Sequence, residues 1–266
     1  MTTIAFGGDV HGHLGQIKRH MQLAKAANAS HYIQLGDYNL FQDRSWDRDI
    51  QTAAEKNDLQ VYFIDGNHDN FPYLNELNPD NLAEPIPVTH DVHYLPRNSR
   101  LTIDGLTFHA MGGAHSIDEN YRTLNRDLYT EEDITPENIN LALTMPQADI
   151  LLSHDSPLTS PNPIVRDSRL QRQAEINYGA DVLQSCHENQ KRLTTITEHL
   201  QPSIIFHGHY HRYYEGTSLH TTTGNHFYTY GLDEGSSFKT NLHLKVFTTT
   251  VLQDIIGTMK EKDEND

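Results

Sequence analysis

Apolar runs that end in glycine and metal-binding side chains recur along this chain, and this repetition limits the possible folds more than composition does. The first run, residues 4–8, ends in two glycines followed by Asp9 and His11. Residues two apart in a strand point the same way, so both side chains could reach one point beyond the sheet edge. One carboxylate and one imidazole suit a metal of the manganese, iron, zinc or nickel type. An isolated Asp-x-His is more often a polar turn, so the later runs decide between the two interpretations.

The next runs predict parallel strands joined by helices. Apolar residues between 14 and 24 recur at spacings of three and four, which predicts a helix. The strand expected over residues 31–35 follows it and ends at Gly36 and Asp37. A strand, a helix and a strand form a βαβ unit whose right-handed crossover places the two strands side by side and parallel. Asp9 and Asp37 should therefore emerge at the same sheet edge.

The rest of the chain continues this pattern and then becomes antiparallel in part. Residues 59–64, 148–153 and 203–206 are further expected strands, and a histidine follows each within four residues. Asp104 and Gly105 predict a two-residue hairpin turn. The remaining expectations are helices over 43–57, 136–145 and about 182–200, extended loops over 112–135 and 157–163, and two to four antiparallel strands within 212–250.

Five strand ends carry side chains that could bind metal together. Each also fits a simpler role when taken singly: Asp37 as a turn cap, Asn67 as a left-handed residue, His154 as a core histidine. In open α/β sheets, ligands bind beyond the carboxyl ends of the strands. Five compatible sets at such ends therefore favour a shared site. The candidate residues are Asp9, His11, Asp37, Asn67, His68, His154, His209 and His211.

These motifs resemble, in order and spacing, those of a known enzyme superfamily. The resemblance covers residues 8–211 and is to the calcineurin-like metallophosphoesterases, particularly their small bacterial and phage-type members. It implies an α/β fold, a four-layer αββα sandwich of two mixed β-sheets flanked by helices. We expect a single domain over residues 1–258 and an acidic, disordered tail over 259–266. The segments that carry the resemblance are Gly8-Asp9-Val10-His11-Gly12, Gly36-Asp37, Gly66-Asn67-His68-Asp69, His154 and Gly208-His209-Tyr210-His211.

The resemblance also implies a role for each motif residue. Two divalent or trivalent metal ions are expected, manganese first, with iron, zinc or nickel as alternatives. The implied ligands are Asp9, His11 and His211 for the first ion, Asn67, His154 and His209 for the second, and Asp37 as the bridge between them. A hydroxide that bridges the metals would attack phosphorus. His68 would protonate the leaving oxygen as general acid, and Asp69 would orient His68.

Departures from the superfamily pattern narrow the substrate class. Protein Ser/Thr phosphatases carry Gly-Asp-x-Val-Asp-Arg-Gly at the second motif, whereas Asp37 is followed here by Tyr38 and Asn39 without Asp-Arg. This argues against that branch. Candidate substrate contacts are His13, Asn39 and Arg122. Arginine suits bidentate phosphate binding, but an ordinary surface ion pair explains Arg122 equally well.

The charge composition argues against polyanionic binding partners. Thirty-six acidic residues against twenty basic ones give a formal charge of −16, which disfavours long nucleic acid and anionic membranes. A small phosphorylated molecule or a nucleotide is therefore the preferred substrate. A cyclic-nucleotide or other small phosphodiesterase is the alternative activity. A catalytically silent binding module ranks lower, because every expected ligand is present together with His68 and Asp69.

The single cysteine, Cys186, excludes an internal disulfide framework and fits a reducing compartment. No apolar run approaches the ~18 residues of a transmembrane helix. The first residues lack the apolar stretch of a signal peptide. We therefore expect a soluble, cytoplasmic enzyme.

Overall fold

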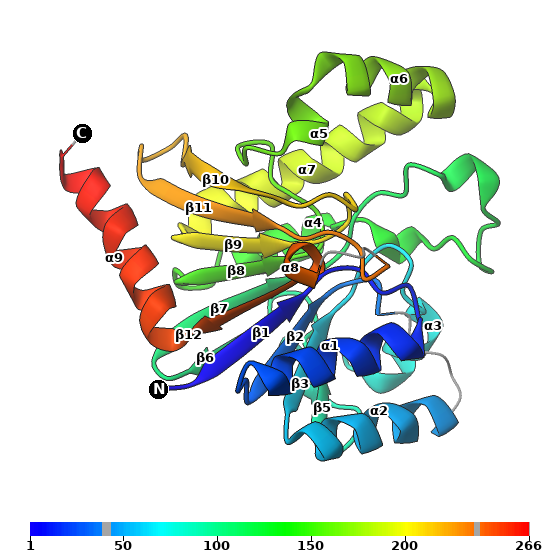
Figure 1. Ribbon diagram of the computed structural model, residues 1–266. Coiled ribbons are helices and arrows are strands. Elements are labelled where there is room, and N and C mark those ends of the chain that lie inside the picture. Colours follow the sequence, from blue (N-terminus) through cyan, green and yellow to red (C-terminus); the bar gives the residue numbers. More distant parts are fainter. Residues whose placement is uncertain (39–43, 237–239, 266) are drawn as a thin grey trace.

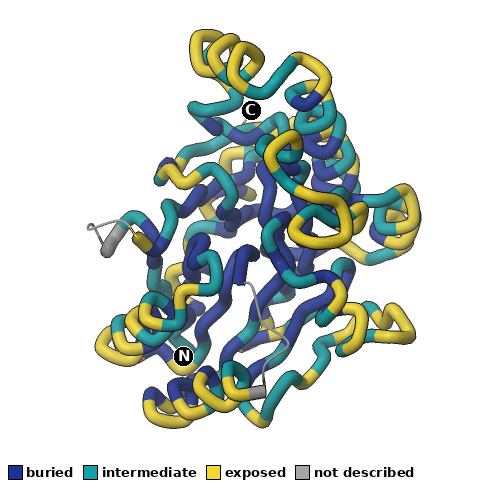
Figure 2. The backbone as a smooth tube through the Cα atoms, turned by 90° about the vertical axis from the view of Figure 1, so that its right-hand side faces the viewer, coloured by how far each residue is buried: buried dark blue, intermediate teal, exposed yellow. Residues whose placement is uncertain are grey.

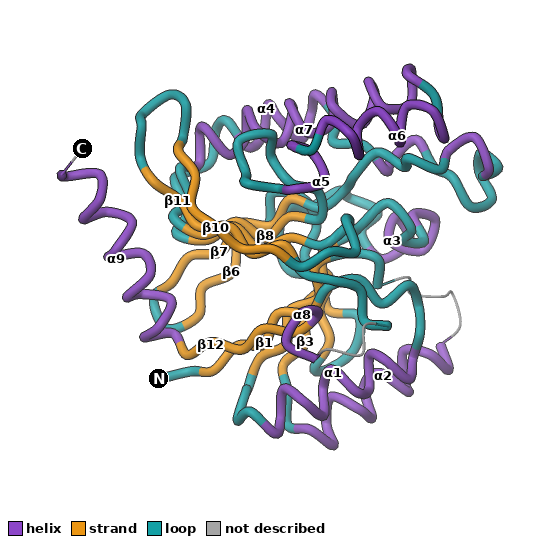
Figure 3. The backbone as a smooth tube through the Cα atoms, turned by 45° about the horizontal axis from the view of Figure 1, so that its top comes forward, coloured by secondary structure: helices purple, strands orange, loops and turns teal. Residues whose placement is uncertain are grey.

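Two six-stranded β-sheets pack face to face, with helices on their outer faces (Figures 1 and 3). The computed structural model describes residues 1–38, 44–236 and 240–265. Both sheets contain parallel and antiparallel pairs, so the expected four-layer αββα sandwich is confirmed. Figure 2 shows the buried strands at the centre beneath largely exposed helices and loops.

The first sheet has a parallel centre and antiparallel edges. Its strand order is β12-β1-β2-β3-β5-β4, and β1, β2, β3 and β5 run parallel. The edge strands β12 and β4 pair antiparallel with β1 and β5. The strands are β1 (Thr3–Gly7), β2 (His31–Leu35), β3 (Gln60–Ile64), β4 (Ile86–Pro87), β5 (Val92–Tyr94) and β12 (Leu244–Thr248).

The second sheet repeats this plan. Its order is β10-β11-β9-β8-β7-β6, with β7, β8, β9 and β11 parallel and the two edge strands antiparallel. Asp104 and Gly105 form the expected two-residue hairpin turn, with φ of 48° and 82°. The strands are β6 (Arg100–Ile103), β7 (Leu106–Met111), β8 (Ile150–Ser153), β9 (Ile204–His207), β10 (Tyr214–Leu219) and β11 (His226–Gly231).

Alternation along the strands separates the core into layers. In β1, Ile4 and Phe6 point between the sheets, whereas Ala5 points toward the helices. Phe6 stacks on Phe206 of β9, with ring centroids 3.9 Å apart, and so joins the two sheets. Burial of each such side chain stabilises the fold by ~1.5–3 kcal/mol. The strand ends that carry the motifs are therefore held on a rigid base.

Helices cover both outer faces. Ile17 and Met21 of α1 and Ile50 of α2 pack over the first sheet, and Leu193 and Ile196 of α7 over the second. Among the described residues, no helix has the length and apolar sequence needed to span a bilayer. The helices are α1 (Leu14–Ala26), α2 (Arg44–Asn57), α3 (Phe71–Leu77), α4 (Pro136–Ala142), α5 (Pro163–Arg166), α6 (Ser168–Tyr178), α7 (Ala180–Leu200), α8 (Thr240–His243) and α9 (Thr249–Asn265).

The loop expected from residue 157 is present up to Asn162, but the two short helices after it were not predicted. Asn162 and Asp167 cap α5 and α6 through hydrogen bonds that their side chains accept from backbone N–H groups. The two to four antiparallel strands expected within 212–250 are found as β10, β11 and β12, each of which has an antiparallel partner. The sequence did not predict that β11 also lies parallel to β9. The last strand, β12, joins the other sheet.

The C-terminal segment also differs from expectation. In place of a disordered tail over 259–266, α9 continues to Asn265. Met259 is buried, and Asp263 accepts hydrogen bonds from the backbone and the ring of His226, so local contacts hold this end. A domain limit at residue 258 would cut α9, and we propose that the domain includes residues 259–265.

Candidate metal centre

The motif residues meet where parallel strands of both sheets end. β1, β2 and β3 are neighbours in the first sheet, and β8 and β9 are neighbours in the second. Each motif lies in the loop that follows one of these strands. Because parallel strands end at the same edge, the fold brings together groups from opposite ends of the chain, such as Asp9 and His211.

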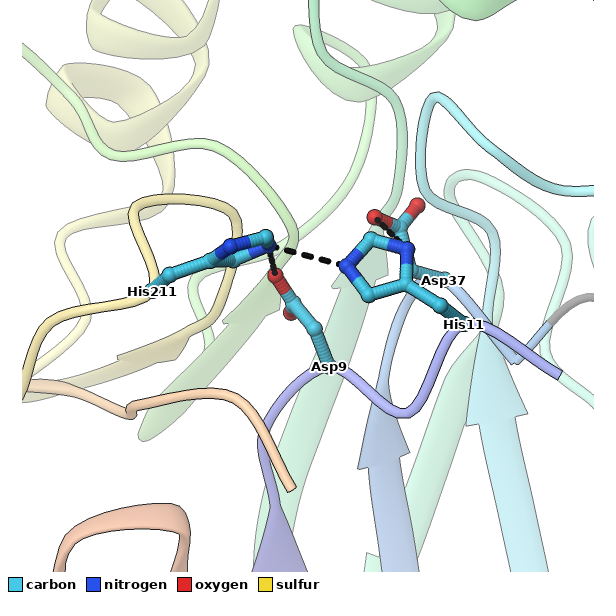
Figure 4. Close-up of side chains that lie close together, drawn as sticks. All are labelled: Asp9, His11, Asp37 and His211. Atoms are coloured by element: carbon cyan, nitrogen blue, oxygen red, sulfur yellow. Dashed lines mark hydrogen bonds and ion pairs between the residues drawn. The ribbon is translucent and has the colours of Figure 1, made fainter. Parts of the chain in front are cut away.

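The first cluster contains Asp9, His11, Asp37 and His211 (Figure 4). Each offers one ligand atom, and these atoms lie within 4.8 Å of one another. The Nε2 atoms of His11 and His211 are 2.9 Å apart, and His211 Nε2 lies 3.1 Å from Asp9 Oδ2. Two imidazoles and two carboxylates that converge in this way can surround one cation.

The second cluster lies deeper. The side-chain oxygen of Asn67 is 3.0 Å from His154 Nε2 and 3.1 Å from His209 Nδ1. His154 Nδ1 lies 2.7 Å from the carbonyl oxygen of Leu35, which directs Nε2 into the cluster. Asn67 and His154 are buried, and His209 is half-buried.

Asp37 lies between the two clusters. One carboxylate oxygen, Oδ2, is 3.5 Å from His11 Nδ1, and the other, Oδ1, is 3.3 Å from His154 Nε2. The backbone N–H of His68 donates to Oδ1 at 2.9 Å. The carboxylate is thus oriented with one oxygen toward each cluster.

The backbone reaches this arrangement through positive φ angles. They are 44° at His11, 50° at Asp37, 71° at His209 and 48° at His211. Such angles are uncommon for residues other than glycine, and they persist where the surrounding structure enforces them. Eleven described residues other than glycine have positive φ, and the three histidines among them, His11, His209 and His211, all belong to the clusters.

Asp9 and His11 meet in one cluster as expected from the sequence, although they lie in a loop, whereas the loop conformation separates His209 from His211. β1 ends at Gly7 and β9 ends at His207, so the paired motif residues lie in loops and not in strands. His209 and His211 consequently diverge: His209 faces Asn67, and His211 faces His11 and Asp9. Alternation along a strand would have pointed both imidazoles at one cluster.

Glycine at position 36 makes room for the deeper cluster. Gly36 has a φ of 87°, and a Cβ there would overlap the ring of His154. The substitution of any other residue would therefore both strain the backbone and displace His154.

The buried aspartates and histidines of the two clusters shift one another's pKa values. Burial alone would raise the pKa of Asp37, but His154, His68 and His11 hold it well below its usual range. Burial opposes a charge on His154 as well, but Asp37 and Asp9 raise its pKa to about 10. Burial lowers the pKa of His209 to about 3. Ionised carboxylates beside nitrogen donors, without sulfur, fit two cations of the manganese, iron, zinc or nickel type.

Comparison with known proteins agrees with this geometry. A family model described as calcineurin-like phosphoesterase matches residues 2–213. The chain belongs to this family. Members are metal-dependent phosphoester hydrolases with a dinuclear metal centre, which the two clusters fit. No curated protein sequence gave a significant match.

Solved structures with the same fold are distant in sequence. The protein TT1561 of Thermus thermophilus superposes with a TM-score of 0.51 at 12% identity, over 88% of this chain and 90% of that one. A dimetal phosphatase from Danio rerio gives 0.52 at 13% identity, over 92% and 91% of the two chains. At these identities the likeness shows a shared fold.

Sequence reasoning missed the residues that orient Asn67. The amide nitrogen of Asn67 donates to Ser116 Oγ at 2.9 Å, which turns its oxygen toward His154 and His209. Ser116 in turn donates to the buried carboxylate of Glu132. Both residues belong to the loop over 112–135, whose length is typical of a functional or disordered segment.

The catalytic candidates also lie here. The ring of His68 is 5.3 Å from that of His11, centroid to centroid, beside the first cluster. Burial lowers the pKa of His68, and nearby Arg122 and His11 lower it further against the opposing effect of Asp37. Asp69 accepts a hydrogen bond from the backbone N–H of Gly66 at 2.7 Å and so closes the turn that carries Asn67 and His68.

The substrate candidates differ from one another. Arg122 reaches the site and donates to the carbonyl oxygen of Asn67 at 3.3 Å, but its guanidinium also pairs with Glu132 at 2.9 Å. His13 is exposed at the start of α1. Asn39 lies outside the described residues. Arg122 and Glu132 are both nearly buried, so their ion pair is not on the surface, and a phosphate would have to compete with it for the guanidinium.

Proposed function

We propose that this calcineurin-like phosphoesterase hydrolyses a phosphate ester of a small molecule or nucleotide at a dinuclear metal site. One observation carries the proposal: the two oxygens of Asp37 face separate sets of ligands. Asp9, His11 and His211 would hold the first ion, and Asn67, His154 and His209 the second. When bound, the two ions supply positive charge for the phosphoryl oxygens and acidify water enough for attack at neutral pH.

The chain's own residues position and protonate the substrate. His68 borders the first cluster, where it would hold the proton that the leaving oxygen receives. Burial lowers the pKa of His68 in the free protein. A bound phosphate would raise this pKa, because a nearby negative charge favours imidazolium. His68 would therefore become protonated, and so able to act as general acid, when the substrate binds. Asp69 would orient His68, as the resemblance to the superfamily implies.

Charge supports the choice of a small substrate. The formal charge of −16 disfavours long nucleic acid and an anionic membrane as partners. A cyclic-nucleotide or other small phosphodiesterase is the alternative activity of the same site.

We propose manganese as the first metal to test. We also propose the cytoplasm as the compartment, since the single cysteine has no disulfide partner.

Turnover of para-nitrophenyl phosphate and of its bis-ester, each with manganese, tests the proposal. The wild type should hydrolyse at least one ester, and His68→Asn should lose ~10²–10⁴-fold of that activity with both metals still bound. Turnover of the bis-ester alone would identify a diesterase. No turnover of either ester, together with less than two metal ions per chain by elemental analysis, would reject the proposed function.

A further inference from the structure

The fully buried side chain of Gln34 connects the two turns that carry Asp9 and Asp37. Gln34 lies in β2, paired in register with Gly7 of β1. Its amide nitrogen donates to the carbonyl oxygen of Gly8 at 2.7 Å and to that of Gly36 at 2.8 Å. Gly8 directly precedes Asp9, and Gly36 directly precedes Asp37. One amide group thus binds both turns.

The two carbonyl groups lie beyond the β-ladder. β1 ends at Gly7 and β2 at Leu35, so neither carbonyl belongs to a strand, and both glycines are buried. Buried carbonyl groups require a donor. Since both partners are acceptors only, the orientation of the Gln34 amide is fixed without ambiguity.

A row of hydrogen-bonded, buried side chains ends at the side-chain oxygen of Gln34. The hydroxyl of Tyr32 donates to the side-chain oxygen of Gln34. Tyr32 has then used its only proton, so His20 Nδ1, 2.9 Å from that hydroxyl, must be the donor to it. His20 Nε2 therefore accepts from Nδ1 of His243, 2.8 Å away.

This row of hydrogen-bonded side chains leads back to the turn that carries Asp9. The backbone carbonyl of His243 accepts a hydrogen bond from the N–H of Gly8 at 2.9 Å. His20, Tyr32 and His243 are all fully buried. Gly8 is therefore held on both sides of its peptide unit, and every hydrogen bond in the row is oriented toward Gln34.

We propose that Gln34 is a positioning residue that sets the separation between Asp9 and Asp37 and so determines whether two metal ions bind as a coupled pair. The inference rests on the dinuclear site proposed above. Asp9 would serve the first ion and Asp37 both. Paired ions sit ~3.5–4 Å apart, a spacing that tolerates little displacement of the bridging carboxylate.

A different result is expected if Gln34 has only a structural role. Replacing a buried glutamine that merely satisfies two carbonyl groups would lower stability without changing metal affinity or the coupling between the ions. A positioning residue would change the metal pair itself. The deciding measurement is therefore metal binding and the magnetic coupling between ions, independent of catalysis.

The experiment compares Gln34→Met with Asn57→Leu. Asn57 is a matched control because it is buried and donates to a backbone carbonyl, that of Ala53, within α2 and away from the clusters. Manganese binding to metal-free protein is followed by calorimetry, and the loaded protein by electron paramagnetic resonance. We expect the wild type and Asn57→Leu to bind two exchange-coupled ions. Gln34→Met should bind the second ion ~10–100-fold more weakly and lose the coupled signal.

Each outcome decides the inference. Two coupled ions of wild-type affinity in folded Gln34→Met overturn it and leave the dinuclear proposal intact. Fewer than two ions in the wild type overturn the dinuclear proposal and this inference with it. If Gln34→Met does not fold, Gln34→Glu decides, because a carboxyl group keeps the shape of the side chain but can donate to at most one of the two carbonyl groups. Weaker binding of the second ion in Gln34→Glu supports the inference, and unchanged binding overturns it.

Discussion

His154 couples the protonation of the site to the stability of the protein. It is fully buried, 3.3 Å from Asp37 and 3.9 Å from Asp9, and these carboxylates raise its pKa to about 10 against the effect of burial. Without metal, the imidazolium of His154 thus neutralises part of the negative charge. A metal ion would take over this role and displace the proton, because a ligating histidine must be neutral.

This coupling predicts a pH-dependent stability for the metal-free protein. The folded pKa of His154 lies above the unfolded value near 6.5, so its contribution is complete below pH 6.5 and is lost as the pH rises through 10. The loss amounts to a few kcal/mol, at ~1.36 kcal/mol per pKa unit. In EDTA, the difference in free energy of unfolding between wild type and His154→Asn should shrink from pH 6.5 to 10, measured by urea denaturation.

His207→Asn is the matched control for this measurement. His207 is equally buried, but burial lowers its pKa to about 4, so it stays neutral throughout the range. Its difference from the wild type should change by less than about 0.5 kcal/mol over this range, because only the unfolded state still binds a proton near pH 6.5. Parallel pH profiles for wild type and His154→Asn would contradict the assigned charge on His154.

At the scale of secondary structure, α9 joins the two sheets. It packs against β11 of the second sheet and β12 of the first. Leu252 and Ile256 are buried in the core between the sheets. In Figure 1, α9 lies at the opposite side of the molecule from α3 and the loop over 112–135. Its contribution to stability should therefore be separable from the site.

Truncation of Leu252 tests this separation. Leu252→Ala leaves a cavity in a fully buried position and should lower the free energy of unfolding by ~2–5 kcal/mol. Manganese stoichiometry at saturation should not change, because α9 contributes no candidate ligand. Urea denaturation and elemental analysis measure the two quantities. The adjacent Val251 is 43% exposed, so Val251→Ala should change stability little. Loss of metal in Leu252→Ala would contradict the independence of α9 from the site.

Elements with a strong local pattern could be predicted from sequence, and those defined by tertiary contacts could not. β1, α1 and β2 match their expected ranges because glycine and helical periodicity mark them. α9 was missed, although Leu252, Ile256 and Met259 follow helical spacing, because its acidic end suggested a tail. The parallel pairing of β11 with β9 has no local signal, since it depends on which strand takes the edge.

The candidate site, too, could be predicted only in part. The sequence motifs show which residue types it contains, so Asp9, Asp37 and His211 could be predicted as members of one site. Their directions depend on positive φ angles, which local sequence did not reveal. Ser116 could not be identified either, because its contact with Asn67 joins residues 49 positions apart.

For the whole molecule, the metal site is also a connection between the two sheets. Asp9, Asp37 and Asn67 follow strands of the first sheet, whereas His154, His209 and His211 follow strands of the second. Each cluster combines residues from both sheets. An ion bound to either cluster would therefore resist separation of the sheets, which is part of unfolding.

Metal binding should accordingly stabilise the entire fold. A ligand at 100 times its Kd adds ~2.7 kcal/mol to the free energy of unfolding when it binds only the folded state. For a protein of about this size, manganese should then raise Tm by roughly 5–10 °C over the EDTA-treated protein. Differential scanning calorimetry at several manganese concentrations measures the shift, which should grow with the logarithm of the concentration above Kd.

Asp37→Asn separates this effect from general salt stabilisation. The substitution retains the shape of the side chain and removes the charge that faces both clusters, so the variant should lose most of the manganese-dependent shift and most of the activity. Sodium chloride at equal ionic strength should change the wild type and the variant alike. An equal manganese shift in both proteins would mean that the ions stabilise the fold elsewhere, and Asp37 would then have no bridging role.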